Sequence, residues 1–461
     1  MRITAKPPSL LPQPVTEAPT GPSEGLWRNL DYVWWLSTDT GGALARSLHN
    51  FAVPLLALYV TGSPVQAGMV AAIGQVGRLL TTVPGGVLAD RYNRRRLIVI
   101  GAASGAVLAL ALAAMQLAGF MSFWLLSTLN LLMNIRGGLF DSTTNAALKS
   151  VVAPRSVGSA VAANEGRDAV VALSGGPLGG VLMVLGHAVP FLVTCILEVI
   201  SALSVLRIRA DLRPAREPAA RTGYLNEARE GLSWLFHRPE LRGVMIISTI
   251  VNLGINAALT TVVFGLQQRG ESPATIGLTT SAIGVGMLAG ALVAPVLVRR
   301  VPTGRLSALG LIFVAGSVAV LPFVQTLPAI CAALAASMVA APAINASLLG
   351  YFMVAVPTRL LGRATSALDV LAMGAVPLAP LVAGFGYAAW GWAGALVLCS
   401  GICATAAVLA MFDRGLRTLP NSERWPDHAA EIARTAQSPG VRRRRTDRSV
   451  PGRPIHRFQG H

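Results

Sequence analysis

The sequence predicts an all-α integral membrane protein with twelve transmembrane helices in two bundles of six. Apolar residues make up 53% of its 461 residues and charged residues only 13%. The apolar residues gather in about a dozen blocks of some 20 residues, the length that crosses a hydrocarbon layer about 30 Å thick. Backbone groups in that layer find no water to hydrogen-bond, so the blocks must be helices. Membrane-barrel strands would alternate apolar and polar residues, and these blocks do not.

Each block is justified as a span by its length and its continuous apolar character. In chain order, we expect helices at residues 33–60, 66–89, 97–118, 122–146, 157–186, 190–208, 243–266, 274–298, 305–324, 328–355, 365–388 and 393–412. The four cysteines lie inside these blocks, which excludes a disulfide framework and a zinc site.

Basic residues lie almost entirely on one side of the predicted spans. On that side they occur at positions 91, 94–96, 149, 155, 207–229, 299–305, 359 and 363. The connections on the other side hold one arginine, Arg269. Short basic loops stay in the cytoplasm, so we expect a multi-pass protein of the inner (plasma) membrane with both termini cytoplasmic.

The same pattern divides the chain into five parts. Residues 1–30 form a disordered N-terminal tail, 31–208 the first bundle, 209–242 a cytoplasmic linker and 243–413 the second bundle. Residues 414–461 form a basic disordered tail with eleven arginines. We expect that tail to lie near an anionic membrane leaflet, and not to bind nucleic acid. A stretch of the linker, residues 225–236, is amphipathic and could lie on the membrane surface.

An internal repeat supports the division into halves. Residues 87–97 align without gaps with residues 296–306, so each pair lies 209 positions apart. Each segment ends the second helix of its half. Halves related by an axis along the membrane normal are how many carriers are built.

The loop after the second helix carries a family signature. The segment from Gly86 to Arg95 reads Gly, three residues, Asp-Arg, one residue, Asn, Arg, Arg, and it resembles the loop motif of the major facilitator superfamily. The motif has glycine where this chain has Asn93. Asparagine tolerates positive φ best after glycine, so we expect the turn to be kept. With the spans, the long middle loop and the repeat, the resemblance covers residues 27–412 and implies the major facilitator fold.

The resemblance implies a gate at this loop. Its members are Gly86, Asp90, Arg91, Asn93, Arg94 and Arg95. In the family, the aspartate and arginines latch the second helix to its neighbours when the protein faces outward. Here Asp90 would lie near the start of the eleventh helix, where Asp369 could pair with Arg91 or Arg94. The alternative is that the arginines only fix orientation and bind anionic lipid.

Three further stretches, residues 28–35, 61–64 and 230–242, resemble the branch that includes enterobactin exporters and macrolide efflux proteins. The fifth helix carries Gly176, Pro177, Gly179 and Gly180, a partial match to the element associated with antiporting exporters, one residue shorter than the usual spacing. Small residues there allow close helix contact and a bend at Pro177.

Charges inside the predicted spans are concentrated in the first half. A charge at the bilayer centre costs about 2.5–3.5 kcal/mol on insertion scales, so each one requires a reason. Helical spacing places polar residues on one face of each of the first, fourth and fifth helices, and these faces must point into the bundle or a cavity. The candidate cavity residues are Arg46, Asn50, Asn130, Asn134, Arg136 and Asp141, with Asn252 and Asn256 from the second half.

The candidate proton carriers are Glu198, Asp168, Glu165 and Asp39. Glu198 lies near the middle of the sixth helix among apolar neighbours, where desolvation favours the protonated carboxyl. The alternative is a neutral or paired carboxyl with a packing role. Asp168 is the second candidate, although Arg167 or Arg136 could hold it as an ion pair.

These residues favour a proton-coupled exporter of a small amphipathic molecule, such as a drug, an antibiotic or a siderophore-like metabolite. A metabolite uptake carrier of the same fold stays open, as do a permease driven by a separate ATPase and an intramembrane enzyme. The chain has no Gly-Lys-Ser or Gly-Lys-Thr of a P-loop and no cluster among its six histidines. We therefore expect no enzyme activity, no cofactor and no metal, and a monomer that works with substrate, protons and lipid.

Overall fold

The computed structural model describes residues 26–153, 156–213, 239–356, 373–425 and 427–428, and these are helical with short connections. In the first half the helices are α1 (Leu30–Thr61), α2 (Pro64–Arg91), α3 (Arg94–Leu117), α4 (Phe123–Val151), α5 (Val157–Leu185) and α6 (Val189–Arg207). In the second half they are α8 (Pro239–Gln268), α9 (Pro273–Arg300), α10 (Thr303–Val320), α11 (Leu327–Val339), α12 (Ala341–Ala355), α14 (Ala379–Phe412) and the short α15 (Arg414–Arg417). The described residues contain no strand.

The described elements reproduce the predicted spans to within about five residues, except that the start of the eleventh span lies outside the described residues. Together α11 and α12 form one span, with a break at Ala340. The segment labelled α14 contains the last two spans, which are separated at Gly391, where a positive φ of 64° interrupts the helix. Nine described helical segments are long and apolar enough to cross a membrane. The more polar α2 and α4 are not among them.

Local sequence explains where the helices begin. The side chains of Asn29, Ser63, Ser122 and Ser272 accept hydrogen bonds from backbone N–H groups in the first turns of α1, α2, α4 and α9. Proline follows at the first position of α2 and α9. A backbone N–H at that position has no partner within the helix, so proline loses no hydrogen bond there. These polar caps fix the level at which each helix leaves the hydrocarbon layer.

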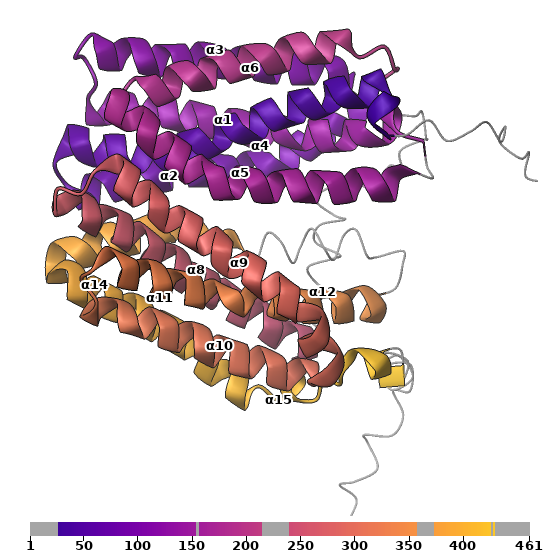
Figure 1. Cartoon of the computed structure of the whole chain (residues 1–461), viewed down its shortest axis with the longest axis vertical. Helices are drawn as coiled ribbons and strands as arrows, with labels where there is room; N and C mark the ends of the chain where they lie inside the picture. Colours follow the sequence, from indigo (N-terminus) through magenta and orange to yellow (C-terminus); the bar gives the residue numbers. More distant parts are fainter. Residues whose placement is uncertain (1–25, 154–155, 214–238, 357–372, 426, 429–461) are drawn as a thin grey trace, which may run out of the picture.

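The helices form two bundles (Figure 1), one of α1–α6 and one of α8–α14. In the first bundle α2 packs on α4, and α6 packs on both α1 and α3. In the second, α14 packs on α8 and α10, and α9 packs on α11. The fold class predicted from the sequence is confirmed.

The bundles touch at the end far from the chain termini. There α5 packs against α9, and α2 against α14 (Figure 1). The Gln267 side chain of α8 also donates a hydrogen bond to the carbonyl of Leu55 in α1, at 2.8 Å. Toward the other end the bundles diverge. The molecule is therefore closed at one end, which we call the closed end.

Glycines make the two contacts at the closed end possible. A Cβ on Gly277 of α9 would lie 2.5 Å from the carbonyl oxygen of Gly176 in α5. The contact between α2 and α14 is equally close. A Cβ on Gly68 would collide with the carbonyl oxygen of Pro380, and a Cβ on Gly384 would lie 2.5 Å from that of Pro64. The helices thus approach backbone to backbone, as small residues allow in membranes.

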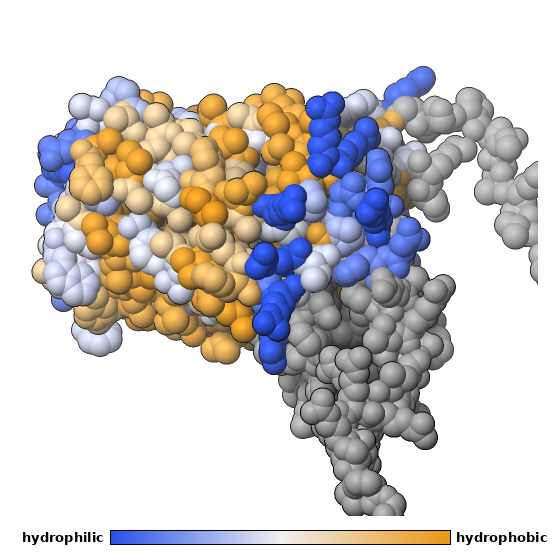
Figure 2. Space-filling view, turned by 90° about the horizontal axis from the view of Figure 1, so that it is seen from below, coloured by the Kyte–Doolittle hydropathy of each residue, from blue (hydrophilic) through white to orange (hydrophobic). Residues whose placement is uncertain are grey.

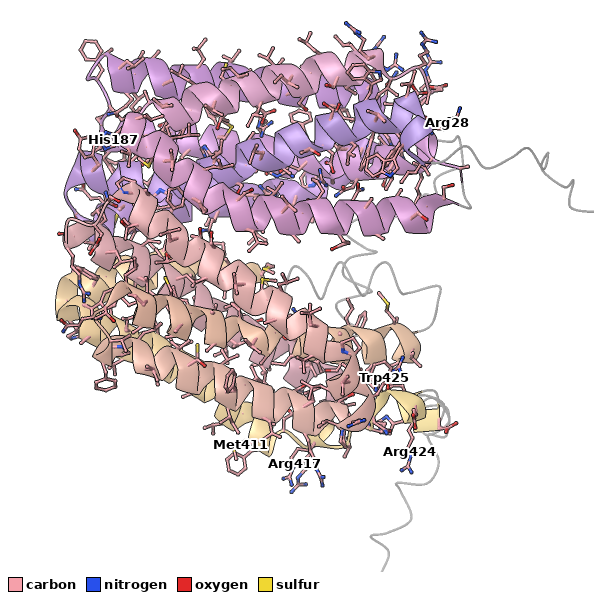
Figure 3. The ribbon with its side chains drawn as sticks, in the orientation of Figure 1. Arg28, His187, Met411, Arg417, Arg424 and Trp425 are labelled. Carbon is pink, nitrogen blue, oxygen red and sulfur yellow. The ribbon has the colours of Figure 1, made fainter. Side chains whose placement is uncertain are left out.

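The opposite end carries most of the described basic residues, and we call it the basic end. Figure 3 places Arg28, Arg417 and Arg424 there and His187 at the closed end. Between the ends, exposed apolar side chains form a belt on the second bundle, as Figure 2 shows, with Leu292 and Leu309 76% and 63% exposed. This belt is the lipid-facing surface of a membrane protein.

Part of the segment predicted as a basic tail is folded. The indole N–H of Trp425 donates to the Thr303 hydroxyl at the start of α10, at 3.0 Å. The Tyr351 hydroxyl lies 3.0 Å from Nδ1 of His428. These two bonds hold Trp425 and His428 against the second bundle. Residues 429–461, most of the linker and the start of the eleventh span lie outside the described residues.

We predict that Gly277→Val destabilises the protein through the closed end. Overpacking a close helix contact lowers the free energy of unfolding by about 1–3 kcal/mol. Gly316→Val in α10 is the matched control, because a Cβ at position 316 has no neighbour within 4 Å. Melting of the two variants in the same detergent should show a lower melting temperature for Gly277→Val only. Equal melting temperatures would contradict the backbone contact.

Candidate substrate cavity and buried ion pairs

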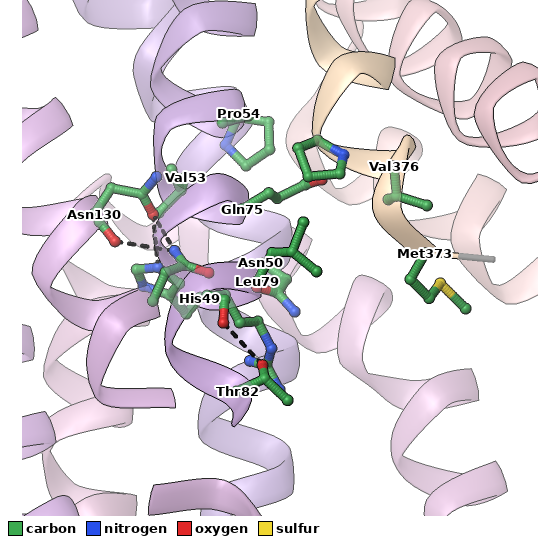
Figure 4. Close-up of a pocket in the computed structure, with 14 residues that line it drawn as sticks. His49, Asn50, Val53, Pro54, Gln75, Leu79, Thr82, Asn130, Met373 and Val376 are labelled. Atoms are coloured by element: carbon green, nitrogen blue, oxygen red, sulfur yellow. Dashed lines mark hydrogen bonds between the residues drawn. The ribbon is translucent and has the colours of Figure 1, made fainter. Parts of the chain in front are cut away.

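A cavity of about 500 Å³ opens between the two bundles (Figure 4). Polar side chains from α1, α2 and α4 line one side of it. They are His49, Asn50, Gln75, Arg78, Thr82, Asn130 and Asn134. Its size and shape suit a small organic molecule.

The remaining wall of the cavity is apolar. Val53, Pro54 and Leu79 belong to the first bundle, and Met373, Val376 and Pro377 reach it from the second. A molecule in this cavity therefore places polar groups on the first bundle and an apolar body against the second.

A hydrogen-bond network in the cavity wall fixes the tautomer of His49. The Asn130 amide nitrogen donates to the carbonyl of Val70, at 2.8 Å. Its amide oxygen therefore faces Nε2 of His49, at 3.0 Å, so Nε2 must carry the proton. His49 is only 5% exposed, and its Nδ1 has no hydrogen-bond partner in the described part of the chain. That nitrogen is left as an acceptor.

An ion pair links α4 and α6 close to the cavity. Nη2 of Arg136 lies 3.0 Å from Oε1 of Glu198, and the two side chains are 9% and 3% exposed. Nη1 of Arg136 also donates to the carbonyl of Gly101 in α3, at 3.0 Å. Gly105 of α3 provides the space, since a Cβ there would lie 2.7 Å from Nη1 of Arg136. Three helices thus enclose one buried pair.

Two arginines share a single carboxylate beside the cavity. Nη2 of Arg78 lies 3.0 Å from one oxygen of Asp141, and Nη1 of Arg46 lies 3.5 Å from the other. Gly137 of α4 leaves room for this group, because a Cβ there would lie 3.0 Å from Nη1 of Arg78. The carboxylate therefore connects α1, α2 and α4.

A third charged group lies nearer the basic end. Nη2 of Arg167 in α5 lies 2.5 Å from Asp39 of α1 and 3.0 Å from Asp168. Asp39 is buried, whereas the Asp168 side chain is 56% exposed. Glu165 is exposed.

Two small voids connect these groups to the cavity. A void of about 20 Å³ is bordered by His49, Asn134, Arg136 and Glu198. A second of about 30 Å³ is bordered by Glu198, Arg136, Arg46, Asp141 and Asp39. Each is large enough for a water molecule and has polar partners for it. The void beside His49 shares lining residues with the cavity, and the two voids share Arg46, Arg136 and Glu198. We call this succession of polar side chains, from the cavity past Glu198 to Asp39, the polar path.

The structure brings some of the predicted cavity residues together and separates others. Asn50, Asn130 and Asn134 line the cavity, and Arg46, Arg136 and Asp141 border the adjoining voids. In α8, Asn256 donates to the carbonyl of Asn252 at 2.8 Å, and neither residue borders these spaces.

At the loop signature the expected turn is replaced by a helix cap. Asn93 has φ −62°, so the expectation of positive φ was wrong. Its side chain instead accepts a hydrogen bond from the N–H of Arg95, at 3.0 Å, and begins α3. Arg95 donates to the carbonyls of Ile208 and Ala210 after α6. Asp90 and Arg91 are exposed, and Asp369 lies outside the described residues.

The glycines of α5 face two neighbours. Gly175 and Gly179 lie against Ser47 and Phe51 of α1, and Gly176 and Gly180 lie against α9. The element around Pro177 thus packs α5 between the two bundles.

Four residues that line the cavity were not among the predicted cavity residues. They are His49, Gln75, Arg78 and Thr82. His49 lies three positions after Arg46 and one before Asn50, so the helical stripe already contained it. Gln75, Arg78 and Thr82 recur at spacings of three and four in α2, which marks one helix face.

No group of three metal-binding side chains is found in the described ranges. The cavity wall contains amides, one imidazole, one guanidinium and the hydroxyl of Thr82, a set suited to hydrogen bonding an organic molecule.

We predict that Arg136→Gln destabilises the protein more than Arg136→Gln combined with Glu198→Gln. The single change leaves a buried carboxylate without its counter-charge, which costs about 3–5 kcal/mol. The double change replaces the charges by two amides. Chemical or thermal unfolding of both variants measures the difference. Equal losses in the single and double variants would show that the pair is not coupled.

Comparison with known proteins agrees with this architecture. The family model of the Major Facilitator Superfamily matches residues 41–270 and again residues 244–450. A search of curated protein sequences finds no match.

Solved structures of transporters have a similar fold. The nucleoside transporter NupG, 12% identical, covers 82% of this chain and 99% of its own, with a TM-score of 0.67. A bacterial homologue of the iron transporter ferroportin, in an inward-facing state, is 16% identical over 83% of this chain and 100% of its own, with a TM-score of 0.61.

A bacterial homologue of the human lysosomal transporter Spinster, inward-facing and unoccupied, is 14% identical over 88% of this chain and 97% of its own, with a TM-score of 0.64. At these identities the likeness concerns the fold alone. Because the family model spans both bundles, the chain belongs to the Major Facilitator Superfamily.

Proposed function

We propose that the protein is a proton-coupled secondary transporter that exports a small amphipathic molecule by alternating access. Membership of the superfamily supports a membrane transporter of a small molecule, and not an enzyme. The observation that carries the finer proposal is the buried pair of Arg136 and Glu198, which a small void connects to the cavity wall.

Protonation of Glu198 would change the balance of charge in the first bundle. A neutral Glu198 leaves the buried guanidinium of Arg136 without its counter-charge, and an unpaired charge at membrane depth is costly. A change of bundle arrangement that rehydrates Arg136 then becomes favourable. Proton binding and the conformational change are coupled in this way.

The proton route follows the polar path. Glu198 and Asp39 border the same void, and Asp39 pairs with Arg167, which also holds Asp168. We assign Glu198 as the carrier, and Asp39 and Asp168, with Glu165 nearby, as the exit toward the basic end. In vesicles the potential of about 200 mV would supply about 4–5 kcal/mol per proton, enough for a roughly thousandfold substrate gradient.

The proposed direction of transport depends on which end of the molecule faces the cytoplasm. Basic loops stay in the cytoplasm, so the basic end would be the cytoplasmic one and both termini would lie there, in the inner membrane. The bundles diverge toward that end, which would admit substrate from the cytoplasm. When that end closes, Asp90, Arg91 and Arg94, with Asp369, would form the latch that the loop signature implies.

Proton exchange by the purified protein tests the proposal. Liposomes containing the protein and the internal pH dye pyranine, without ATP, receive anionic, neutral and cationic dansyl compounds outside. Antiport predicts that the interior pH rises as a compound enters, whereas proton-linked uptake predicts a fall. We expect Glu198→Gln to lower the initial rate at least tenfold, because the carboxyl that titrates is gone, and Asp168→Asn to lower it less.

The matched control is Arg299→Gln, at the exposed end of α9 and far from the polar path. It should exchange protons at the wild-type rate. Proton exchange that Glu198→Gln leaves unchanged would exclude this carboxyl as the carrier. A fall in interior pH would favour the uptake carrier.

Orientation has its own test. We expect green fluorescent protein fused after residue 461 to fluoresce in cells and alkaline phosphatase fused there to be inactive, because the basic end should be cytoplasmic. Fusions after Arg269, in the connection of α8 and α9, should give the opposite result. Active phosphatase at the C-terminus would reverse the proposed direction of transport.

A further inference from the structure

The charges nearest the cavity do not balance. Arg46 and Arg78 share the one carboxylate of Asp141, so this group carries one net positive charge. The neighbouring Arg136 is matched by Glu198. Nearer the basic end, Arg167 contacts both Asp39 and the largely exposed Asp168, so that more distant group carries one net negative charge. No carboxylate lines the cavity among the described residues.

The unmatched charge is accessible. The side chains of Arg78 and Arg46 are 42% and 30% exposed, compared with 17% for Asp141. Arg78 lines the cavity itself, and Arg46 lies one helical turn before the cavity residue Asn50. Each guanidinium has five N–H donors, and Asp141 is close to one nitrogen of each. Donors are therefore left that can turn toward a ligand.

The rest of the wall defines the remainder of the ligand. Val53, Leu79, Met373 and Val376 provide apolar contact. Oε1 of Gln75 is buried and has no hydrogen-bond partner in the described ranges, so it can accept a bond from a ligand N–H or hydroxyl. An apolar body, one donor group and one negative charge would satisfy all three features.

We propose that the substrate is an amphipathic organic anion whose acidic group binds Arg78, with Arg46 behind it. This inference rests on the proposed function and specifies its substrate class. Asp141 offsets part of the positive charge of the two guanidiniums, so its carboxylate weakens their attraction for the ligand anion. A cation would instead meet an unmatched positive charge.

Three dansyl compounds of the same body and different charge test the proposal. They are dansylglycine (anion), dansylglycinamide (neutral) and dansylamidoethyl-trimethylammonium (cation), each with a sulfonamide N–H. Dansyl fluorescence titration and melting-temperature shifts of the purified full chain measure binding, without requiring transport. We expect dansylglycine to bind at least tenfold tighter than the other two, the size of a hydrogen bond to a charged group.

Substitutions separate the arginines from the general basic charge. Arg78→Gln should weaken dansylglycine binding about tenfold to a hundredfold and Arg46→Gln severalfold. Asp141→Asn should strengthen it, because the carboxylate that offsets the positive charge is gone. Arg299→Gln, which removes the same charge at the basic end, should bind as wild type does.

Each contrary result is specific. Failure of dansylglycine to bind, equal or tighter binding of the neutral or cationic compound, or an unchanged affinity in Arg78→Gln would overturn the proposal. Proton exchange with the neutral or cationic compound would leave the proposed function standing and remove this inference. Tight binding of dansylglycine without any proton exchange would support the anionic substrate and contradict the proposed proton coupling.

Discussion

Pairing of charge inside the first bundle is the constraint on which the rest of the structure depends. The hydrocarbon layer penalises each lone charge, and within the described spans every ion pair joins residues of α1, α2, α4, α5 and α6. Glycines at positions 105 and 137 leave the room that two of these pairs need. The helices of the first bundle thus pack around its arginines, and in the proposed function a change in the protonation of Glu198 would alter this packing.

The two bundles divide the work of binding. Described polar contacts to the cavity come from α1, α2 and α4, whereas the second bundle contributes Met373, Val376 and Pro377. The bundles meet through glycine contacts at the closed end, where nothing charged is broken when they separate. In the proposed alternating access, rocking of one bundle on the other would therefore break mainly van der Waals contacts and the bond from Gln267 to Leu55, while the charged groups stay within the first bundle.

The spans were predictable because hydrophobic length is a local property. The prediction of 66–89 for the second span compares with Pro64–Arg91 in the structure. Pairing was not predictable, because it depends on the rotation of each helix about its axis. Arg136 and Glu198 are 62 positions apart, and Asp168 was as plausible a partner for Arg136 from spacing alone. Asn93 was misjudged for a related reason: a residue suited to a turn also suits a helix cap.

The unmatched charge of Arg46, Arg78 and Asp141 gives the proposed cycle a consistent electrostatic direction. An anion that leaves the cell while a proton enters moves two positive charge equivalents inward, so an inside-negative potential contributes about 4.6 kcal/mol per 100 mV. A cation exported for one proton would move no net charge and gain nothing from the potential. Occupied by an anion, the group around Asp141 is neutral, and the loaded cavity can then be sealed between the bundles at the lowest desolvation penalty. Substrate charge and bundle closure are thereby linked through the same three side chains.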